Sequence, residues 1–144
     1  MFACLFFGDS LALGAGAAVN ALLTRSCEVR AAEGASSSAM LRWPLQRRMY
    51  DTTILSIGSN DDVGPTVSAG QSGRAFARIA ALRGSAGGRR VIWLLPYERR
   101  RAALVRRVAV TFDDEVLDLA RFATRDRIHP ADYRSLAAAL LRGR

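Results

Sequence analysis

The sequence predicts an α/β protein in which a parallel sheet is covered by helices on both faces. Stretches typical of strands alternate with stretches typical of helices along the chain, an order that favours a parallel sheet. The apolar run from Phe2 to Phe7 contains no alternating polar residues, as in central strands buried on both faces. Of the 144 residues, 50% are hydrophobic, which suffices for a core and argues against a disordered chain.

The first predicted elements surround a short polar segment. The strand Phe2 to Phe7 ends abruptly in Gly8-Asp9-Ser10. Leu13 to Arg25 is rich in alanine and leucine and predicts a helix, and Ser26 to Ala32 predicts a short second strand. A serine on a sharp turn after a strand is a candidate nucleophile. Asp9 or Ser10 could equally cap the next helix, and this stretch alone leaves both roles open.

The middle of the chain predicts an interrupted helix and a buried strand. Glu33 to Ser38 form a loop whose serines can cap a helix from Ser37 to about Met49. Pro44 should kink or split that helix, because proline lacks the N–H that a helical hydrogen bond requires. Asp51 to Ile57 is rich in β-branched residues and predicts the third strand, which runs into Gly58-Ser59-Asn60-Asp61.

The second half of the chain alternates in the same way. A loop from Val63 to Ala69, with Gly64-Pro65 in it, leads into a helix from about Ala69 to Arg83. Arg90 to Pro96 predicts the fourth strand, and Glu98 to Phe112 a helix whose residues 108–111 could alternatively pair as a strand. The remaining elements are a short fifth strand, a loop and a last helix with proline in its first turn: Glu115 to Leu119, Ala120 to Ile128 and Pro130 to Leu141.

Five parallel strands joined by helices restrict the topology. Crossovers between parallel strands are right-handed, which makes the flavodoxin-like strand order 2-1-3-4-5 the leading prediction. The sequence contains no internal repeat, linker or low-complexity segment, and a second domain has no room. We therefore expect one domain over residues 1–144.

The charge narrows the class of partner. The formal net charge is +8, and all 21 basic residues are arginines. Such a balance could indicate a nucleic acid or another anionic polymer. Arginine and alanine are abundant throughout the chain, so a biased coding composition explains the charge better, and nucleic acid is not expected as a partner. The densest run, Arg99 to Arg101, is interpreted as a solvated helix face.

Cysteine and histidine usage limits disulfides and metals. Cys4 and Cys27 both fall in predicted strands and are interpreted as small buried hydrophobic residues rather than as a disulfide framework. His129 is the sole histidine and no C-x-x-C pair occurs, so no metal site is expected. Asp9 interrupts the apolar start and no basic segment precedes it, so a signal peptide is not expected. We expect a soluble chain without a membrane span, cytoplasmic or part of a larger assembly.

Polar residues at the carboxyl ends of the predicted strands meet the requirements of acyl transfer. Ser10 follows the first strand, Gly34 the second, Asn60 the third, and Asp126 and His129 the fifth. These strand ends share one crevice, and the first and third strands flank the point where the strand order reverses. His129 can take the proton of the Ser10 hydroxyl, and Asp126 can fix the tautomer of its ring. The backbone N–H groups of Ser10 and Gly34 and the side-chain amide of Asn60 could stabilise an oxyanion.

These residues resemble the four conserved blocks of the SGNH, or GDSL-type, hydrolases. The blocks correspond, in the family's order and over essentially the whole chain, to Gly8-Asp9-Ser10-Leu11, Gly34, Gly58-Ser59-Asn60-Asp61 and Asp126-Arg127-Ile128-His129-Pro130. The resemblance implies a three-layer α/β/α fold, with Ser10 as nucleophile, His129 as base and Asp126 as its partner. It also implies an oxyanion hole formed by Ser10, Gly34 and Asn60, although Ala35 or Ser37 could be the backbone donor of the second block. No cofactor is expected.

Each of these residues also has a structural alternative. Asn60 could be a turn residue with positive φ, and His129 could cap the last helix. Asp61 is interpreted as a residue that caps or solvates the following loop, and Ser36 to Ser38 as helix caps. The occurrence of all four blocks in family order favours the catalytic interpretation.

Two other classes of α/β enzyme are not supported. An α/β-hydrolase requires a G-x-S-x-G elbow, which Ser10 lacks. A dinucleotide site requires G-x-G-x-x-G in the first turn, whereas Gly14-x-Gly16 lies inside a predicted helix and is interpreted as a close-packing position.

We therefore expect a carboxylic ester hydrolase that acts through an acyl-Ser10 intermediate on short acyl groups, such as acetyl on a carbohydrate. The loops are too short for a lid or a deep acyl tunnel. The alternatives are a thioesterase or lysophospholipase with the same residues, and a non-catalytic carbohydrate- or lipid-binding module. The expected partner is a small-molecule or glycan ester, and the sequence leaves the oligomeric state open.

Overall fold

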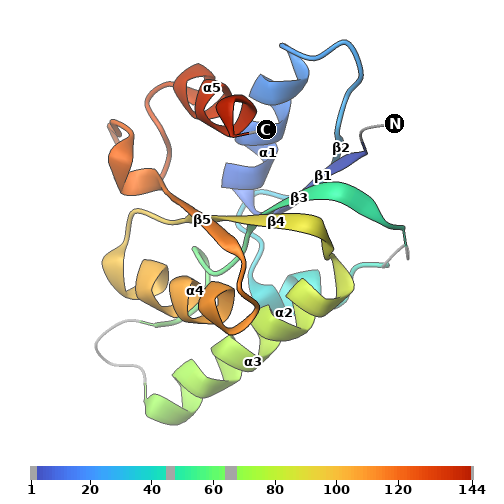
Figure 1. The fold of residues 1–144 in the computed structure, drawn as a ribbon. Helices are drawn as coiled ribbons and strands as arrows, with labels where there is room; N and C mark the ends of the chain where they lie inside the picture. The colour runs from blue at the N-terminus through green and yellow to red at the C-terminus, as the bar shows by residue number, and fades with distance from the viewer. Residues whose placement is uncertain (1–2, 45–47, 64–67, 144) are drawn as a thin grey trace.

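A sheet of five parallel strands forms the centre of the molecule (Figure 1). The computed structural model describes residues 3–44, 48–63 and 68–143, and the sheet order β2-β1-β3-β4-β5 confirms the prediction. The strands are β1 (Cys4–Gly8), β2 (Glu28–Ala31), β3 (Tyr50–Ser56), β4 (Gly88–Leu95) and β5 (Glu115–Asp118). The helices are α1 (Ser10–Asn20), α2 (Ser37–Met40), α3 (Ala69–Ser85), α4 (Arg99–Thr111), the 3₁₀ turn η1 (Leu119–Arg121) and α5 (Tyr133–Arg142).

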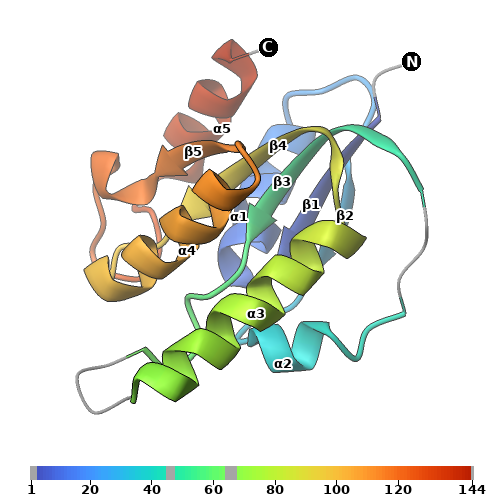
Figure 2. The same ribbon diagram turned by 60° about the horizontal axis from the view of Figure 1, so that its bottom comes forward.

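Helices cover both faces of the sheet, so the molecule has three layers (Figures 1 and 2). Helices α1 and α5 pack on one face, and α2, α3 and α4 pack on the other. The position of β1 in the interior of the sheet explains why its sequence is apolar and lacks alternating polar residues. Phe6 points into the core under α1 and α5, Phe7 points into the core under α2 to α4, and each is only 1% exposed. The two-sided burial predicted for the first strand is therefore confirmed.

The first two helices begin or end elsewhere than predicted. Helix α1 begins at Ser10, three residues early, because the Asp9 side chain caps it by accepting the N–H of Leu11 at 3.0 Å. Helix α2 ends at Met40 rather than near residue 49. Pro44 explains this end, since a proline cannot continue the helical hydrogen bonds and disfavours helical geometry in the residue before it. Residues 45–47 of the predicted helix lie outside the described residues.

The last predicted helix is also corrected. Helix α5 begins at Tyr133 with Asp132 as its cap, so Pro130 is not in its first turn. Pro130 instead pairs with Thr124 in an isolated antiparallel bridge that closes the preceding loop. Residues 108–111 are helical within α4, not a strand. The predicted Gly64-Pro65 loop falls on residues outside the described ranges.

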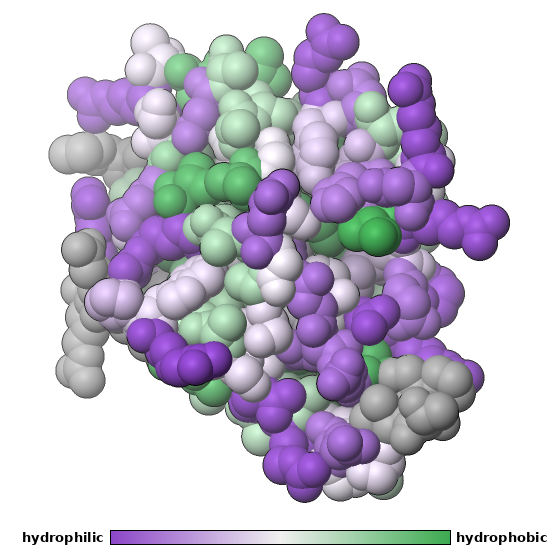
Figure 3. All heavy atoms as spheres, turned by 180° about the vertical axis from the view of Figure 1, so that it is seen from behind, coloured by the Kyte–Doolittle hydropathy of each residue, from purple (hydrophilic) through white to green (hydrophobic). Residues whose placement is uncertain are grey.

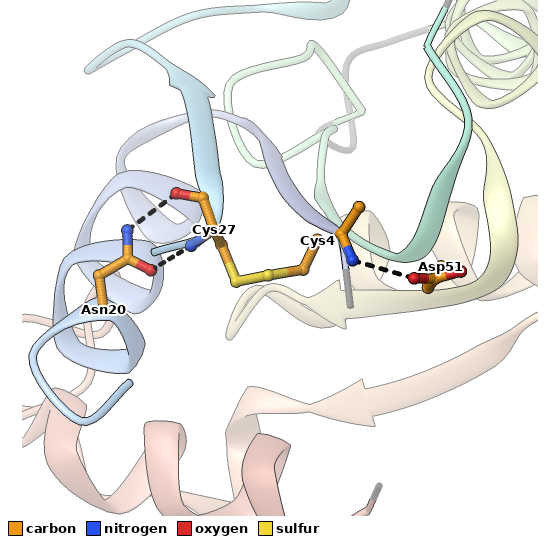
Figure 4. Close-up of a disulfide and its surroundings, with 5 residues drawn as sticks. Cys4, Asn20, Cys27 and Asp51 are labelled. Atoms are coloured by element: carbon orange, nitrogen blue, oxygen red, sulfur yellow. Dashed lines mark hydrogen bonds between the residues drawn. A yellow bond between two sulfur atoms is a disulfide. The ribbon is translucent and has the colours of Figure 1, made fainter. Parts of the chain in front are cut away.

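The two cysteines form a disulfide, which corrects their interpretation as separate buried hydrophobic residues (Figure 4). Cys4 opens β1 and Cys27 directly precedes β2, with 4.7 Å between their Cα atoms. The register pairs Leu5 with Glu28, so the two preceding residues also face each other. Asn20 holds this end of β2, because its amide donates to the Cys27 carbonyl at 3.0 Å and accepts the Cys27 N–H at 2.7 Å. The sheet order predicted that β1 and β2 are neighbours, but the register that brings the sulfurs together comes only from the fold.

The surface is mainly hydrophilic. On the face opposite to that of Figure 1, long hydrophilic side chains surround the outline and hydrophobic ones gather in small patches (Figure 3). In the described part of the chain, the large hydrophobic residues more than half exposed are Leu22, Met49, Val110 and Ile128. None of the described helices combines the length and the apolar character that crossing a membrane requires.

Candidate active site

The turn between β1 and α1 delivers Ser10 to the carboxyl edge of the sheet. Gly8 has a φ of 142°, and a Cβ at this position would lie 1.8 Å from the carbonyl oxygen of Ser56 on β3. Only glycine fits so close an approach in this conformation. The N–H of Asp9 donates to the same carbonyl at 3.0 Å. The chain therefore turns tightly against β3, and Ser10 becomes the first residue of α1.

Asp9 is the buried anchor of this turn. Its carboxylate accepts the Leu11 N–H at 3.0 Å, the Ser56 hydroxyl at 2.7 Å and the Ser59 hydroxyl. Burial raises the pKa of Asp9, while these hydrogen bonds act in the opposite direction. Asp9 is thus the helix cap considered from the sequence, and it also ties the turn after β1 to the end of β3. The sequence interpretation missed Ser56, although a serine ending a buried apolar strand signals a buried polar partner.

Ser10, His129 and Asp126 form one hydrogen-bonded chain. Ser10 Oγ lies 3.0 Å from His129 Nε2, and His129 Nδ1 lies 2.8 Å from Asp126 Oδ2. The three residues come from opposite ends of the sequence and meet because the loops after β1 and β5 leave the same edge of the sheet. The hydrogen bond from His129 lowers the pKa of Asp126 well below its ordinary value. The arrangement allows Nε2 to accept the serine proton while the carboxylate holds the other ring nitrogen.

The loop that carries His129 is held by its own hydrogen bonds. The Thr124 hydroxyl donates to the His129 carbonyl at 2.7 Å and accepts the Arg127 N–H at 2.9 Å. Asp126 Oδ1 accepts the N–H groups of Ile128 and His129 at 2.9 and 2.7 Å. Arg127 has a φ of 63°. A residue with a Cβ rarely adopts such a positive φ, and does so where surrounding contacts stabilise it. The sequence interpretation missed Thr124, because nothing in one sequence separates it from an ordinary loop threonine.

Gly34 remains a candidate oxyanion donor, and its backbone conformation explains why a glycine stands here. Its φ is 68°, and a Cβ would meet nothing within 4 Å, so glycine serves the backbone conformation here and not a close approach. The Ala35 N–H closes the local turn at 3.3 Å, and the Ser37 N–H donates to Asp61 at 2.8 Å. Both alternative donors are therefore engaged. The N–H groups of Gly34 and Ser10 form no hydrogen bond with any described residue.

Asn60 follows β3 with an exposed, oriented side chain. Its amide nitrogen donates to the Ala35 carbonyl at 3.0 Å. A side-chain amide has two hydrogens on this nitrogen, so the second stays available. The register pairs Gly8 of β1 with both Ala31 of β2 and Ser56 of β3. The three candidate donors therefore leave neighbouring strands at the same level.

The Asp61 side chain caps helix α2, which precedes it in the sequence, and not the loop that follows it. Its side chain is 3% exposed and accepts the N–H of Ser37, the first residue of α2, at 2.8 Å. Its carbonyl accepts Arg101 Nε at 2.9 Å. The expectation that Asp61 caps or solvates the following loop is therefore wrong, because the fold places α2 beside this turn. Ser36 is the N-cap of α2, as expected, and accepts the Ala39 N–H at 3.2 Å.

Close packing of α1 against α5 and against the sheet explains the two glycines inside α1. A Cβ at Gly14 would lie 2.4 Å from the Tyr133 ring, and one at Gly16 would lie 2.8 Å from the Val29 side chain. The close-packing interpretation of Gly14-x-Gly16 is confirmed.

Burial raises the pKa of Tyr133 to about 12, and the charges of Asp9 and Asp126 add to the effect. Tyr133 therefore stays neutral beside the catalytic candidates.

The acidic side chains of the site are engaged by the protein itself. Asp9 accepts two serine hydroxyls and a backbone N–H, and Asp126 accepts His129. Within the described ranges, no group of three histidine, cysteine, aspartate or glutamate residues is arranged to hold a metal ion. The chemistry that the site offers is that of a serine, a histidine and hydrogen-bond donors.

Comparison with known proteins gives matches in structure only. No family model matches the sequence, and no curated protein sequence matches it. A member of the lipolytic G-D-S-L family from Veillonella parvula DSM 2008 is similar, with a TM-score of 0.63 and 17% identity over 99% of this chain and 97% of that one. The aryl esterase of M. smegmatis is similar, with a TM-score of 0.66 and 17% identity over 99% and 98% of the two chains.

A third similar solved structure is named as an acetyltransferase rather than as an esterase. The C-terminal catalytic domain of peptidoglycan O-acetyltransferase A from Streptococcus pneumoniae, with a methylsulfonyl adduct, matches with a TM-score of 0.56 and 14% identity. The match covers 98% of this chain and 90% of that one. At these identities the likeness concerns the fold. The chain has the three-layer fold of the G-D-S-L lipolytic proteins, as its four sequence blocks predict.

Proposed function

We propose that this protein is a carboxylic ester hydrolase that works through an acyl-Ser10 intermediate. One observation carries the proposal, namely the chain from Ser10 Oγ to His129 Nε2 at 3.0 Å and from His129 Nδ1 to Asp126 Oδ2 at 2.8 Å. A serine hydroxyl becomes a useful nucleophile when a positioned base removes its proton, and this geometry offers that base.

The reaction follows from these positions. His129 Nε2 takes the Ser10 proton while Oγ forms a bond to the ester carbonyl carbon, and Asp126 stabilises the resulting imidazolium. The oxyanion receives hydrogen bonds from the N–H groups of Ser10 and Gly34 and from the Asn60 amide. His129 then returns the proton to the leaving alkoxide as its bond to carbon breaks. A water molecule repeats the sequence on acyl-Ser10, which releases the acid and restores the serine.

The substrate class proposed is a short-chain ester, such as an O-acetylated carbohydrate. Two of the loops at the carboxyl edge of the sheet are short, with five residues between β2 and α2 at 32–36 and three between β4 and α4 at 96–98. Such loops offer no wall for a long acyl chain. One of the similar solved structures is a peptidoglycan O-acetyltransferase domain, a name that indicates chemistry on an acetyl group.

Replacing the nucleophile tests the proposal. Ser10→Ala should abolish hydrolysis of p-nitrophenyl acetate, because the substitution removes the hydroxyl that forms the acyl intermediate. Circular dichroism and the melting temperature should stay close to those of the wild type, which shows that the loss is chemical. A fluorophosphonate probe should label the wild type at Ser10, located by mass spectrometry. An unchanged kcat in Ser10→Ala, or labelling at another residue, would remove Ser10 from the mechanism.

A further inference from the structure

A polar groove lies beside Asn60, between residues of α2 and α3. These two helices are neighbours on the same face of the sheet (Figure 2). The volume of the groove is about 280 Å³. All the described residues that line it are polar: Ser36, Ser38, Asn60, Asp61, Asp62, Gln71, Arg74 and Arg78. Hydroxyl, amide and charged groups offer little to an aliphatic chain and many hydrogen bonds to a hydroxylated ligand. Asn60, a candidate oxyanion donor, is one of the lining residues, so a ligand in the groove would lie beside it.

Two arginines of the groove are not used by the fold as ion-pair partners. Arg74 and Arg78 are four residues apart on α3 and therefore share one face of the helix. Neither forms an ion pair with a carboxylate of the described chain, whereas Arg83 on the same helix binds Asp114 at 2.7 Å. The Nε of Arg78 donates to the Ser37 hydroxyl at 2.9 Å. This bond orients the Arg78 guanidinium and leaves its terminal nitrogens for a ligand.

The two aspartates of the groove differ in how far their carboxylates are exposed to a ligand. Asp61 is 3% exposed, and one of its oxygens accepts the Ser37 N–H. Its other oxygen is buried and has no hydrogen-bond partner among the described residues. Asp62 is exposed and presents its carboxylate at the rim. An anionic ligand would therefore be attracted by Arg74 and Arg78 and opposed by the carboxylates of Asp61 and Asp62.

We propose that this groove binds the alcohol half of the ester and that this half carries a carboxylate, as in the uronic acid residues of an acidic glycan. Arginine suits this role, because its planar guanidinium matches a carboxylate with two parallel hydrogen bonds. The net charge of +8 raises the local concentration of anionic substrates. The hydroxyl and amide groups of Ser36, Ser38 and Gln71 then face the ring hydroxyls. This inference rests on the ester hydrolysis proposed above and adds the class of alcohol.

Two sugar esters that differ in one group test this inference. Methyl glucuronide and methyl glucoside are each prepared as a mixture of their mono-O-acetyl isomers at the ring hydroxyls, and acetate release is measured. The wild type should have a kcat/KM for the glucuronide about tenfold or more above that for the glucoside, since a charged hydrogen bond contributes an effect of this order. Arg74→Gln should lower this ratio several-fold, because one of the two guanidinium groups is lost. Asp62→Asn should raise it, because the opposing charge is lost.

A matched control separates local recognition from net charge. Arg25→Gln removes the same charge from an exposed arginine before β2, at the opposite edge of the sheet, and should leave the ratio at the wild-type value. Equal kcat/KM for the two esters in the wild type, turnover of neither sugar ester, or an unchanged ratio in Arg74→Gln would overturn the inference. If p-nitrophenyl acetate is still hydrolysed in that case, the proposed esterase function stands. Absence of that activity overturns both.

Discussion

Two aspartates of the candidate site carry out different tasks because their environments differ. Asp9 is fully buried, which raises its pKa, and its hydrogen bonds to Leu11, Ser56 and Ser59 fix the turn that presents Ser10. Asp126 is exposed, and the hydrogen bond from His129 lowers its pKa. The carboxylate of Asp9 holds the turn in place, and that of Asp126 stays charged next to His129. Burial and partner, rather than residue type, decide the role of each.

His129 should set the acid limb of the pH profile. Because the pKa of Asp126 is lowered, its carboxylate remains charged throughout the range in which imidazoles ordinarily titrate, near pH 6.5. We expect kcat/KM for p-nitrophenyl acetate to rise through a single ionisation and then to level off. Asp126→Asn should lower kcat by about 10²–10⁴-fold without unfolding the protein, because control of the tautomer is lost. A rate independent of pH from about 5 to 9, or full activity of Asp126→Asn, would contradict this assignment.

Asn60→Ala should lower kcat much more than it raises KM. The Asn60 amide is proposed to donate to a negative charge that exists only in the transition state, so its loss belongs in kcat. One such donor is ordinarily worth about 10²–10³ in kcat. Asn20→Ala is the matched control, because it also removes an amide that bonds backbone groups, but at the far edge of the sheet. An effect confined to KM would make Asn60 a substrate-binding residue.

The elements of the fold position the site through their ends rather than their interiors. Strand β1 ends at Gly8, where a Cβ would collide with β3, and α1 begins two residues later with its cap already paired. At the other end of the same strand, the disulfide from Cys4 to Cys27 joins β1 to the start of β2. The site is at the carboxyl edge and the covalent link is at the amino edge.

Removing the disulfide should therefore affect stability and spare catalysis. The double substitution Cys4→Ala with Cys27→Ala opens a loop with a sequence separation of 23 residues. The free energy of unfolding in urea should fall by about 3 kcal/mol, because the unfolded chain gains the conformational freedom that the link removes. The kcat for p-nitrophenyl acetate should remain at the wild-type value. A reducing agent should lower the stability of the wild type alone, and an equal urea midpoint for both proteins would argue against a structural disulfide.

At the scale of the whole molecule, the polar character of the surface beside the site should set the acyl preference. The groove beside Asn60 is lined by polar residues, and the large exposed hydrophobic residues of the described chain are scattered over different elements. Neither provides an apolar channel for a long acyl chain. We expect kcat/KM to fall by about tenfold or more from the acetyl to the octanoyl p-nitrophenyl ester, where each extra methylene finds no apolar contact. A rise along this series would favour lipase or thioesterase chemistry.

Prediction from sequence succeeded where the signal is local and periodic. The apolar run before Gly8, the β-branched run before Gly58 and the alternation of strands and helices predict the sheet order that the structure confirms. The starts of α1 and α5 were misplaced, because the side chains of Asp9 and Asp132 decide them and a periodic pattern does not show which polar residue caps. Asp61 was assigned to the wrong neighbour for a similar reason, since its partner Ser37 is 24 residues away.

The sequence by itself determined the fold class, the strand order and the residue types available for chemistry, because hydrophobic periodicity and turn residues act within a few positions of each other. Only the tertiary structure decided which of those residues meet. The 3.0 Å contact of Ser10 with His129 spans 119 positions, and the pairing of Cys4 with Cys27 depends on the register of two strands. Register and loop geometry arise from packing of the whole core, so contacts at long range along the chain become definite only once the layers of helices and sheet are in place.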